Sequence, residues 1–172
     1  GRVEATAFFT GTGVNKPRGI LTYAAGTTNG TIEQIVSGAA TAVTADGLYD
    51  LVYSLKDFYT ANAKFVMKRT TVRDVLKLKD GDGQYMWQIG DIKSGQPATL
   101  LAYPVIRAED METVGASALA ILFGDIATAY TIVDRLGITM LRDNLTAKPY
   151  VKFYHRRRVG GDVVNFEAYK LM

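Results

Sequence analysis

The sequence predicts an α+β fold in which mixed sheets are flanked by helices. Helix-like and strand-like apolar periodicities alternate along the chain without the regular strand-helix-strand order of a doubly wound parallel sheet. Of the 172 residues, 48% are hydrophobic and 22% are charged, which fits one compact domain or two small lobes that share a core. There is no internal repeat, heptad run or low-complexity tract, so solenoids and coiled coils are not indicated.

The N-terminal part of the chain combines one helix end with weak strand signals. The apolar pair Phe8 and Phe9 precedes a Gly- and Pro-rich run at 11–19, where we expect a helix to stop. Residues 20–23 have strand character. A further short strand is expected at 31–36.

Two helices and a strand are expected in the next segment. Asp46 is suited to cap a helix that runs to about residue 61. Its apolar residues recur at three- and four-residue steps and are Leu48, Leu51, Val52, Leu55 and Tyr59. A strand is expected at 64–68, and Thr70 is expected to cap a second helix that ends in the turn at 79–83.

The remainder of the chain is rich in strand signals. Strands are expected at 85–88, 100–106, 119–123, 131–135 and 137–142. A polar loop separates the first two of these strands, and a short helix or turn through Tyr130 follows the third. The last segment, 148–172, is expected to hold two strands hinged at 160–162.

No residue pattern indicates an enzyme, a cofactor site or a metal centre. His155 is the only histidine and there is no cysteine, so few options remain for nucleophilic catalysis or a zinc site. The glycines at 11–13 lack the remainder of a dinucleotide fingerprint or a P-loop. The run at 80–83 opens like a calcium loop, but Tyr85 stands where that loop needs glycine. We therefore expect no catalytic, cofactor-binding or metal-binding residues.

The surplus of positive charge is concentrated near the C-terminus. The formal net charge is +3, and Arg156, Arg157 and Arg158 are consecutive. On a strand, Arg156 and Arg158 would point to one face and Arg157 to the other, which is awkward for a single nucleic-acid patch. We expect these arginines to form ion pairs within the chain or between subunits, with a solvated face and direct nucleic-acid binding as alternatives. The candidate acidic partners are Asp125, Asp134 and Asp143.

The order of these signals resembles that of tailed-bacteriophage major capsid proteins with the Hong Kong 97 fold. Phe8-Phe9 with the glycines at 11–13, followed by 17–21, resembles the junction after the long spine helix of that family. The further matching segments are 62–67 with Thr70, 76–80, 83–87, 100–106, 109–111, 123–125 with Tyr130, 134–135 and 158–168.

The resemblance implies an axial and a peripheral lobe. The implied parts are 1–20, the end of the spine helix in the peripheral domain; 21–123, the axial domain; 124–158, the peripheral domain; and 159–172, a C-terminal strand that returns to the axial domain. Because the chain starts at Gly1, we expect a fragment without the family's N-terminal arm and extended loop. A protruding axial loop is expected between its candidate residues Asp80, Gly83, Trp87 and Pro97.

The function implied by the resemblance is self-assembly. Pentamers and hexamers of the chain would build an icosahedral shell around phage or prophage DNA, with scaffold and portal proteins as further partners. An encapsulin-like nanocompartment shell is the alternative with the same fold, and a nucleic-acid-binding module is the alternative from another class. No apolar run of about 18 residues and no secretory signal occur, so we expect synthesis in the bacterial cytoplasm, a final location in the virion capsid and no membrane partner.

Overall fold

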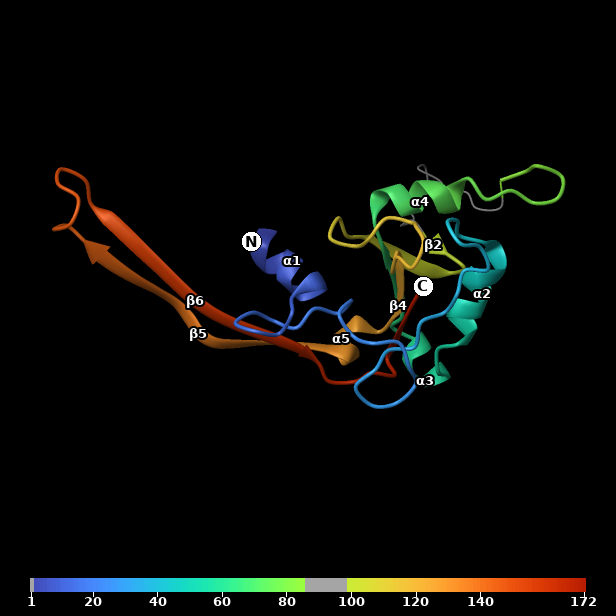
Figure 1. The fold of residues 1–172 in the computed structure, drawn as a ribbon, viewed down its shortest axis with the longest axis horizontal. Coiled ribbons are helices and arrows are strands. Elements are labelled where there is room, and N and C mark those ends of the chain that lie inside the picture. The colour runs from blue at the N-terminus through green and yellow to red at the C-terminus, as the bar shows by residue number, and fades with distance from the viewer. Residues whose placement is uncertain (1, 86–98) are drawn as a thin grey trace.

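The computed structural model describes residues 2–85 and 99–172 and consists of a body and a long hairpin that projects from it (Figure 1). The hairpin is formed by β5 (Tyr130–Asp143) and β6 (Lys152–Val163). The body comprises the described residues of 20–129 and 164–172. The expected α+β class is confirmed, because helices flank a mixed sheet in the body.

The body contains a five-stranded sheet with the order β2-β3-β1-β4-β7. Its strands are β1 (Lys64–Met67), β2 (Thr99–Leu100), β3 (Tyr103–Arg107), β4 (Ile121–Gly124) and β7 (Tyr169–Leu171). β1 lies parallel to β3 and antiparallel to β4, and β4 lies antiparallel to β7. Every residue of β4 is buried, as the apolar run at 119–123 predicts for a central strand.

Alternate residues of the central strands supply two cores on opposite faces of the sheet. Phe65 and Phe123 pack into one cluster with α2 (Ala45–Tyr53) and α4 (Arg69–Leu76). Val66 and Leu122 point the other way, into a cluster with the buried Tyr169. Two short helices, α3 (Asp57–Thr60) and α5 (Ile126–Ala129), complete the body.

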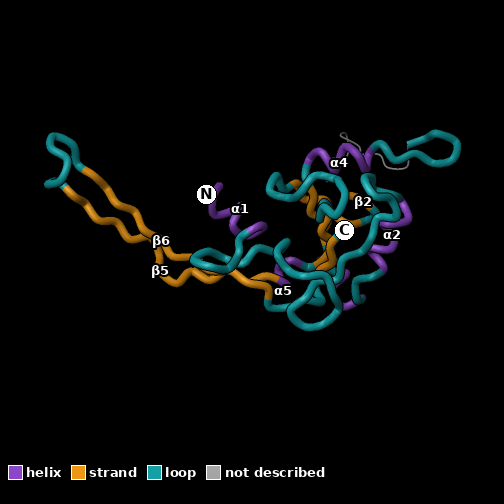
Figure 2. The backbone as a smooth tube through the Cα atoms, in the orientation of Figure 1, coloured by secondary structure: helices purple, strands orange, loops and turns teal. Residues whose placement is uncertain are grey.

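The first helix lies beside the hairpin and not on the sheet (Figure 2). This helix, α1 (Arg2–Thr10), ends before Gly11, as the turn signals predict. The ring of Phe8 meets that of Tyr130, the first residue of β5, edge to face with 6.0 Å between the centroids. α1 therefore packs against the base of the hairpin.

The two predicted helix caps are both wrong by two residues. Thr44, and not Asp46, caps α2, because its hydroxyl accepts the amide hydrogen of Gly47 at 3.1 Å. Asp46 lies inside the first turn, where its negative charge interacts favourably with the positive end of the helix dipole. α4 already starts at Arg69, because the backbone of Lys68 is extended, so Thr70 is a helical residue and not a cap.

The helix expected from residue 46 to 61 is interrupted. α2 ends at Tyr53, and α3 begins at Asp57 after the extended residue Lys56. The apolar stripe crosses this break without a change of spacing, since Leu55 in the connection is buried in the same core as α2. Periodicity alone could not locate the interruption.

Several expected strands also differ from the structure. Residues 20–23 form a turn that buries Ile20, Leu21 and Tyr23. Residues 31–36 contribute only isolated bridges, including one between Gln34 and β7. The strand at 100–106 is split into β2 and β3 by Leu101 and Ala102, whose φ angles of 51° and 70° end a strand. Of the strand expected at 85–88, only Tyr85 lies within the described residues, in an isolated bridge with Lys79.

The hairpin is more continuous than the sequence predicts. The strands expected at 131–135 and 137–142 form the single strand β5, which contains two register shifts. The hinge expected at 160–162 is wrong, because Gly160 and Gly161 are paired with Val133 and Ile132 inside the ladder. The chain leaves the sheet only after Val163, in the segment that leads to β7.

Candidate self-association surface

The base of the hairpin is fixed by hydrogen bonds to the N-terminal segment. The amide of Arg18 donates to the carbonyl of Gly161 at 2.9 Å, and the hydroxyl of Tyr130 donates to the carbonyl of Arg18 at 2.7 Å. The hydroxyl of Tyr23 donates to the carboxylate of Asp162. These bonds set the direction in which the hairpin leaves the body.

The two phenols at the base remain protonated well above neutral pH. Burial, followed by the nearby Tyr23 and Asp162, raises the pKa of Tyr130 to about 12. Burial and the hydrogen bond to Asp162 also raise the pKa of Tyr23. Both hydroxyls can therefore act as donors under physiological conditions.

Arg157 links the hairpin to α1. Its Nη2 lies 2.8 Å from Oδ2 of Asp134 and its Nε lies 3.1 Å from Oδ1 of the same carboxylate. Its Nη1 also lies 3.2 Å from Oε1 of Glu4 in α1. The hydrogen bond to Asp134 raises the pKa of Arg157. Arg157 is thus the arginine of the run that forms an ion pair within the chain, with one of the three predicted acidic residues.

Arg156 and Arg158 occupy the other face of the ribbon, as strand alternation predicts. They pair across the ladder with Thr139 and Leu136, and both are exposed. Within residues 2–85 and 99–172, neither guanidinium has an ion-pair partner. Their charges are therefore available to a molecule outside the chain.

The other two predicted acidic partners serve local roles instead. Asp125 is buried and caps α5, accepting from the hydroxyl of Thr128 at 2.7 Å. Asp143 closes the tip of the hairpin, where its carboxylate accepts from the hydroxyl of Thr146 and the amide of Leu145. These hydrogen bonds lower the pKa of Asp143. The structure does not bring either residue to an arginine of the run.

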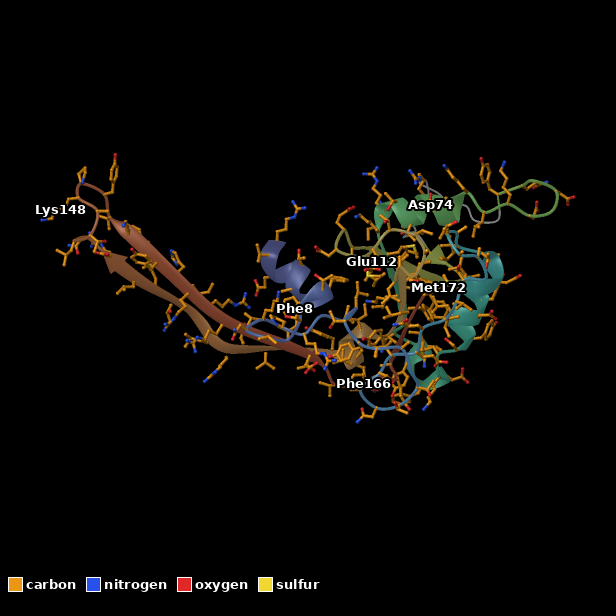
Figure 3. The ribbon with its side chains drawn as sticks, viewed as in Figure 1. Phe8, Asp74, Glu112, Lys148, Phe166 and Met172 are labelled. Carbon is orange, nitrogen blue, oxygen red and sulfur yellow. The ribbon has the colours of Figure 1, made fainter. Side chains whose placement is uncertain are left out.

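Large apolar side chains are exposed on both faces of the hairpin. On the face of Arg156, Leu141 and Tyr154 form a cross-strand pair and are 66% and 50% exposed. On the opposite face, Met140 and Phe153 are 62% and 53% exposed. The further exposed apolar residues of the hairpin are Ile132, Val133, Ile138, Leu145, Tyr150 and Val151. The turn with Lys148 lies at the end of the molecule farthest from the body (Figure 3). A continuous row of exposed apolar side chains is typical of an interaction site.

Part of the predicted axial loop is visible as a turn beyond α4. The carboxylate of Asp80 accepts from the amides of Asp82 and Gln84 at 3.0 and 2.9 Å, and Gly83 has a φ of 80°. This turn is exposed. The candidate residues Trp87 and Pro97 lie outside the described residues.

No local sequence pattern predicts several of the residues that hold the hairpin in place. Glu4, Arg18 and Tyr23 are far from the hairpin along the chain, and only the fold brings them together with Arg157 and Asp162. The side chain of His155, paired across the ladder with Met140, is exposed. In the part of the chain that the structure describes, no group of three or more His, Cys, Asp or Glu could hold a metal ion, and no helix is long and apolar enough to cross a membrane.

A mixed-sheet body with a long hairpin and a flanking helix defines the class of Hong Kong 97-type capsid folds, as the sequence resemblance implies. The chain belongs to the phage capsid family, which it matches over residues 1–172. No curated protein matches it.

Solved capsid structures share this architecture. The chain is similar to the capsid of an empty GTA particle computed with C5 symmetry, with 45% identity and a TM-score of 0.87. The capsid of a native GTA particle gives 44% identity and a TM-score of 0.88. In both cases 99% of this chain is covered, but it spans only 60% of the length of those capsid chains. A structure from Gordonia phage Cozz, at 14% identity, a TM-score of 0.57 and coverage of 98% and 57%, shares the fold.

Proposed function

We propose that the chain is the shell-forming part of a major capsid protein, which assembles with copies of itself into pentamers and hexamers of an icosahedral shell around phage DNA. Membership of the phage capsid family supports this function, as does the similarity to GTA capsids computed with C5 symmetry. The encapsulin-like alternative has no comparable support. The alternative of a nucleic-acid-binding module is supported by the arginine run alone.

The observation that carries the proposal is the exposed hairpin. A two-stranded ribbon has no second layer to cover its apolar side chains, and such ribbons are at best marginally stable in water by themselves. Leu141 and Tyr154 on one face and Met140 and Phe153 on the other are therefore surfaces that another molecule is expected to cover. In a shell, neighbouring copies supply that cover by repeated contacts.

The proposed lobes are assigned to parts of this structure. The segments 1–20 and 124–158 make up the peripheral lobe, which contains α1 and most of the hairpin. The segments 21–123 and 159–172 make up the axial lobe, with the exposed turn at Asp80 and Gly83 at its tip. The boundary at 158/159 lies within β6, so the two lobes share one continuous strand.

The three consecutive arginines have different proposed roles. Arg157 orients the hairpin against α1 through Asp134 and Glu4, whereas Arg156 and Arg158 form contacts with neighbouring subunits. Scaffold, portal and packaged DNA are further proposed partners. The protein is synthesised in the bacterial cytoplasm, resides in the virion capsid and catalyses no reaction.

The proposal is tested with Leu141→Glu and Tyr154→Glu in the complete capsid protein. Two buried carboxylates at a subunit contact would carry a large desolvation cost, so sedimentation should show free subunits in place of shells. The conservative variants Leu141→Met and Tyr154→Phe keep the surface apolar and should assemble. Normal shells from the Glu variant would refute the hairpin as an assembly surface.

A further inference from the structure

The two long edges of the hairpin differ in regularity. β5 contains register shifts between Asp134 and Leu136 and between Leu136 and Thr139, so the extra residues lie on this strand. Such bulges distort a strand and prevent pairing along its outer edge. β6 contains no extra residue between Lys152 and Val163. Only the outer edge of β6 is therefore a regular template for a further strand.

The backbone groups that face this edge can be identified from one observed contact. The carbonyl of Gly161 points away from β5, since it accepts from the amide of Arg18. Alternate residues of a strand share this direction, so Phe153, His155, Arg157 and Val159 also direct their backbone groups outward. The hydroxyl of Thr139 in β5 donates to the carbonyl of Arg156, which agrees with an inward direction for the intervening residues.

This row of backbone groups has no partner in the part of the chain that the structure describes. None of these four residues exchanges a backbone hydrogen bond with a segment outside the hairpin, whereas Gly161 at the base does. An edge with a row of free donors and acceptors recruits an extended segment. The N-terminal segment at Arg18 already begins such pairing at the base of β6.

The side chains of β6 restrict which segment can bind. Lys152, Tyr154, Arg156 and Arg158 lie on one face, and the two arginines have no acidic partner among the described residues. A second β6 laid antiparallel on this edge would bring arginines close to one another, and like charges opposite each other disfavour pairing. A segment with acidic residues at alternate positions would instead place carboxylates opposite the arginines.

The charge of the whole hairpin favours the same partner. Residues 130–163 contain seven Lys and Arg and three Asp, a net charge of +4, whereas the other 138 residues contain 13 basic and 14 acidic residues, a net charge of −1. Nucleic acid fits this charge less well as a partner, because Arg157 points to the other face and is already paired with Asp134 and Glu4.

We propose that the outer edge of β6, from Lys152 to Val159, is a strand-addition site for an extended protein segment with acidic residues at alternate positions and apolar residues between them. The inference rests on the proposed function, because it names the kind of segment that a shell partner lays along the hairpin. Backbone hydrogen bonds to the outward-facing row hold the segment, and Arg156 and Arg158 select its charge.

The test uses the 172-residue chain and a labelled peptide of alternating Glu and Val, with binding followed by fluorescence anisotropy. We expect saturable binding that weakens as salt is added, and no binding of a peptide of alternating Lys and Val. Arg156→Ala with Arg158→Ala should weaken binding about fivefold or more. The matched control Arg69→Ala with Lys77→Ala removes the same charge from α4 and its end and should leave binding unchanged.

Backbone methylation separates strand addition from simple charge attraction. Methyl groups on one alternate set of peptide nitrogens should abolish binding, while methylation of the other set should preserve it, because only one set faces β6. Equal effects of the two sets would overturn the proposal. So would binding of duplex DNA that is stronger than that of the peptide and is lost in the Arg156 and Arg158 variant. Peptide binding is independent of particle formation, so its failure is distinguishable from failure of the shell function.

Discussion

At the base of the hairpin, one glycine has no room for a side chain. A Cβ on Gly161 would lie 2.5 Å from the hydroxyl oxygen of Tyr130, whereas a Cβ on the adjacent Gly160 would have its nearest neighbour at 4.0 Å. We expect Gly161→Ala to lower the free energy of unfolding by about 1–3 kcal/mol, because the tyrosine must move and its bond to Arg18 is lost. Gly160→Ala is the matched control and should change it by no more than about 0.5 kcal/mol. Similar values from urea titrations of the two variants would contradict this description of the base.

The raised pKa of Tyr130 makes the base of the hairpin sensitive to alkali. The folded-state pKa of about 12 exceeds the ordinary value of 10.0, so folding favours the protonated phenol. The contribution of Tyr130 to the free energy of unfolding is therefore complete below pH 10 and is lost as the pH rises through 12. Tyr130→Phe should lower the free energy of unfolding by about 1 kcal/mol near neutral pH, because the hydrogen bond to the carbonyl of Arg18 is lost. The difference in unfolding free energy between wild type and variant should narrow at alkaline pH. A difference that stays constant would contradict the assignment.

Single residues were predictable where the chemistry is local. Strand alternation alone separates Arg157 from Arg156 and Arg158, and Asp134 was among its three predicted partners. Glu4 was not predictable as a partner, because no local pattern relates α1 to β6. Asp125 and Asp143 do not pair with the arginines, because nearby hydroxyl groups donate hydrogen bonds to their carboxylates instead. Asp125 binds Thr128 in this way at the start of a helix, and Asp143 binds Thr146 in a turn.

The hairpin shows which properties of an element can be read from sequence. Its strand content was predicted, but its continuity was not, because the extra residues in β5 and the glycines in β6 both resemble strand ends. In the structure the extra residues of β5 form bulges, and Gly161 in β6 permits the close approach of Tyr130. Similarly, the turn at Leu101 and Ala102 carries no Gly or Pro, so nothing in the sequence divides β2 from β3.

The outer part of the hairpin is expected to contribute little to the stability of the body. Apart from the contact of Arg157 with Glu4, no hydrogen bond or ion pair joins residues 134–159 to the rest of the described chain. Replacement of 134–159 by an Asn-Gly turn between Val133 and Gly160 should therefore shift Tm by only a few degrees. Circular dichroism during heating measures this. A body that unfolds on deletion would show that the hairpin is part of its core.

At the scale of the whole molecule, positive charge is separated from the body. The hairpin carries a net charge of +4 and the other residues of this chain −1, and these opposite signs favour the proposed contacts between the hairpin of one copy and the remainder of another. We expect assembly of the complete capsid protein to slow as ionic strength rises, because screening weakens this attraction. Light scattering during assembly should show the dependence, and it should be reduced in the Arg156→Ala, Arg158→Ala variant. Equal salt dependence in wild type and variant would assign the attraction to other charges.

Cryo-electron microscopy of particles formed by the complete capsid protein tests most directly whether the hairpin is the self-association surface. Closed shells are expected in which Ile138, Leu141 and Tyr154, now 73%, 66% and 50% exposed, are buried against a neighbouring copy. A segment of a neighbouring protein should also lie along β6. Shells in which these side chains remain in solvent, or a protein that forms no shells, would contradict the central claim.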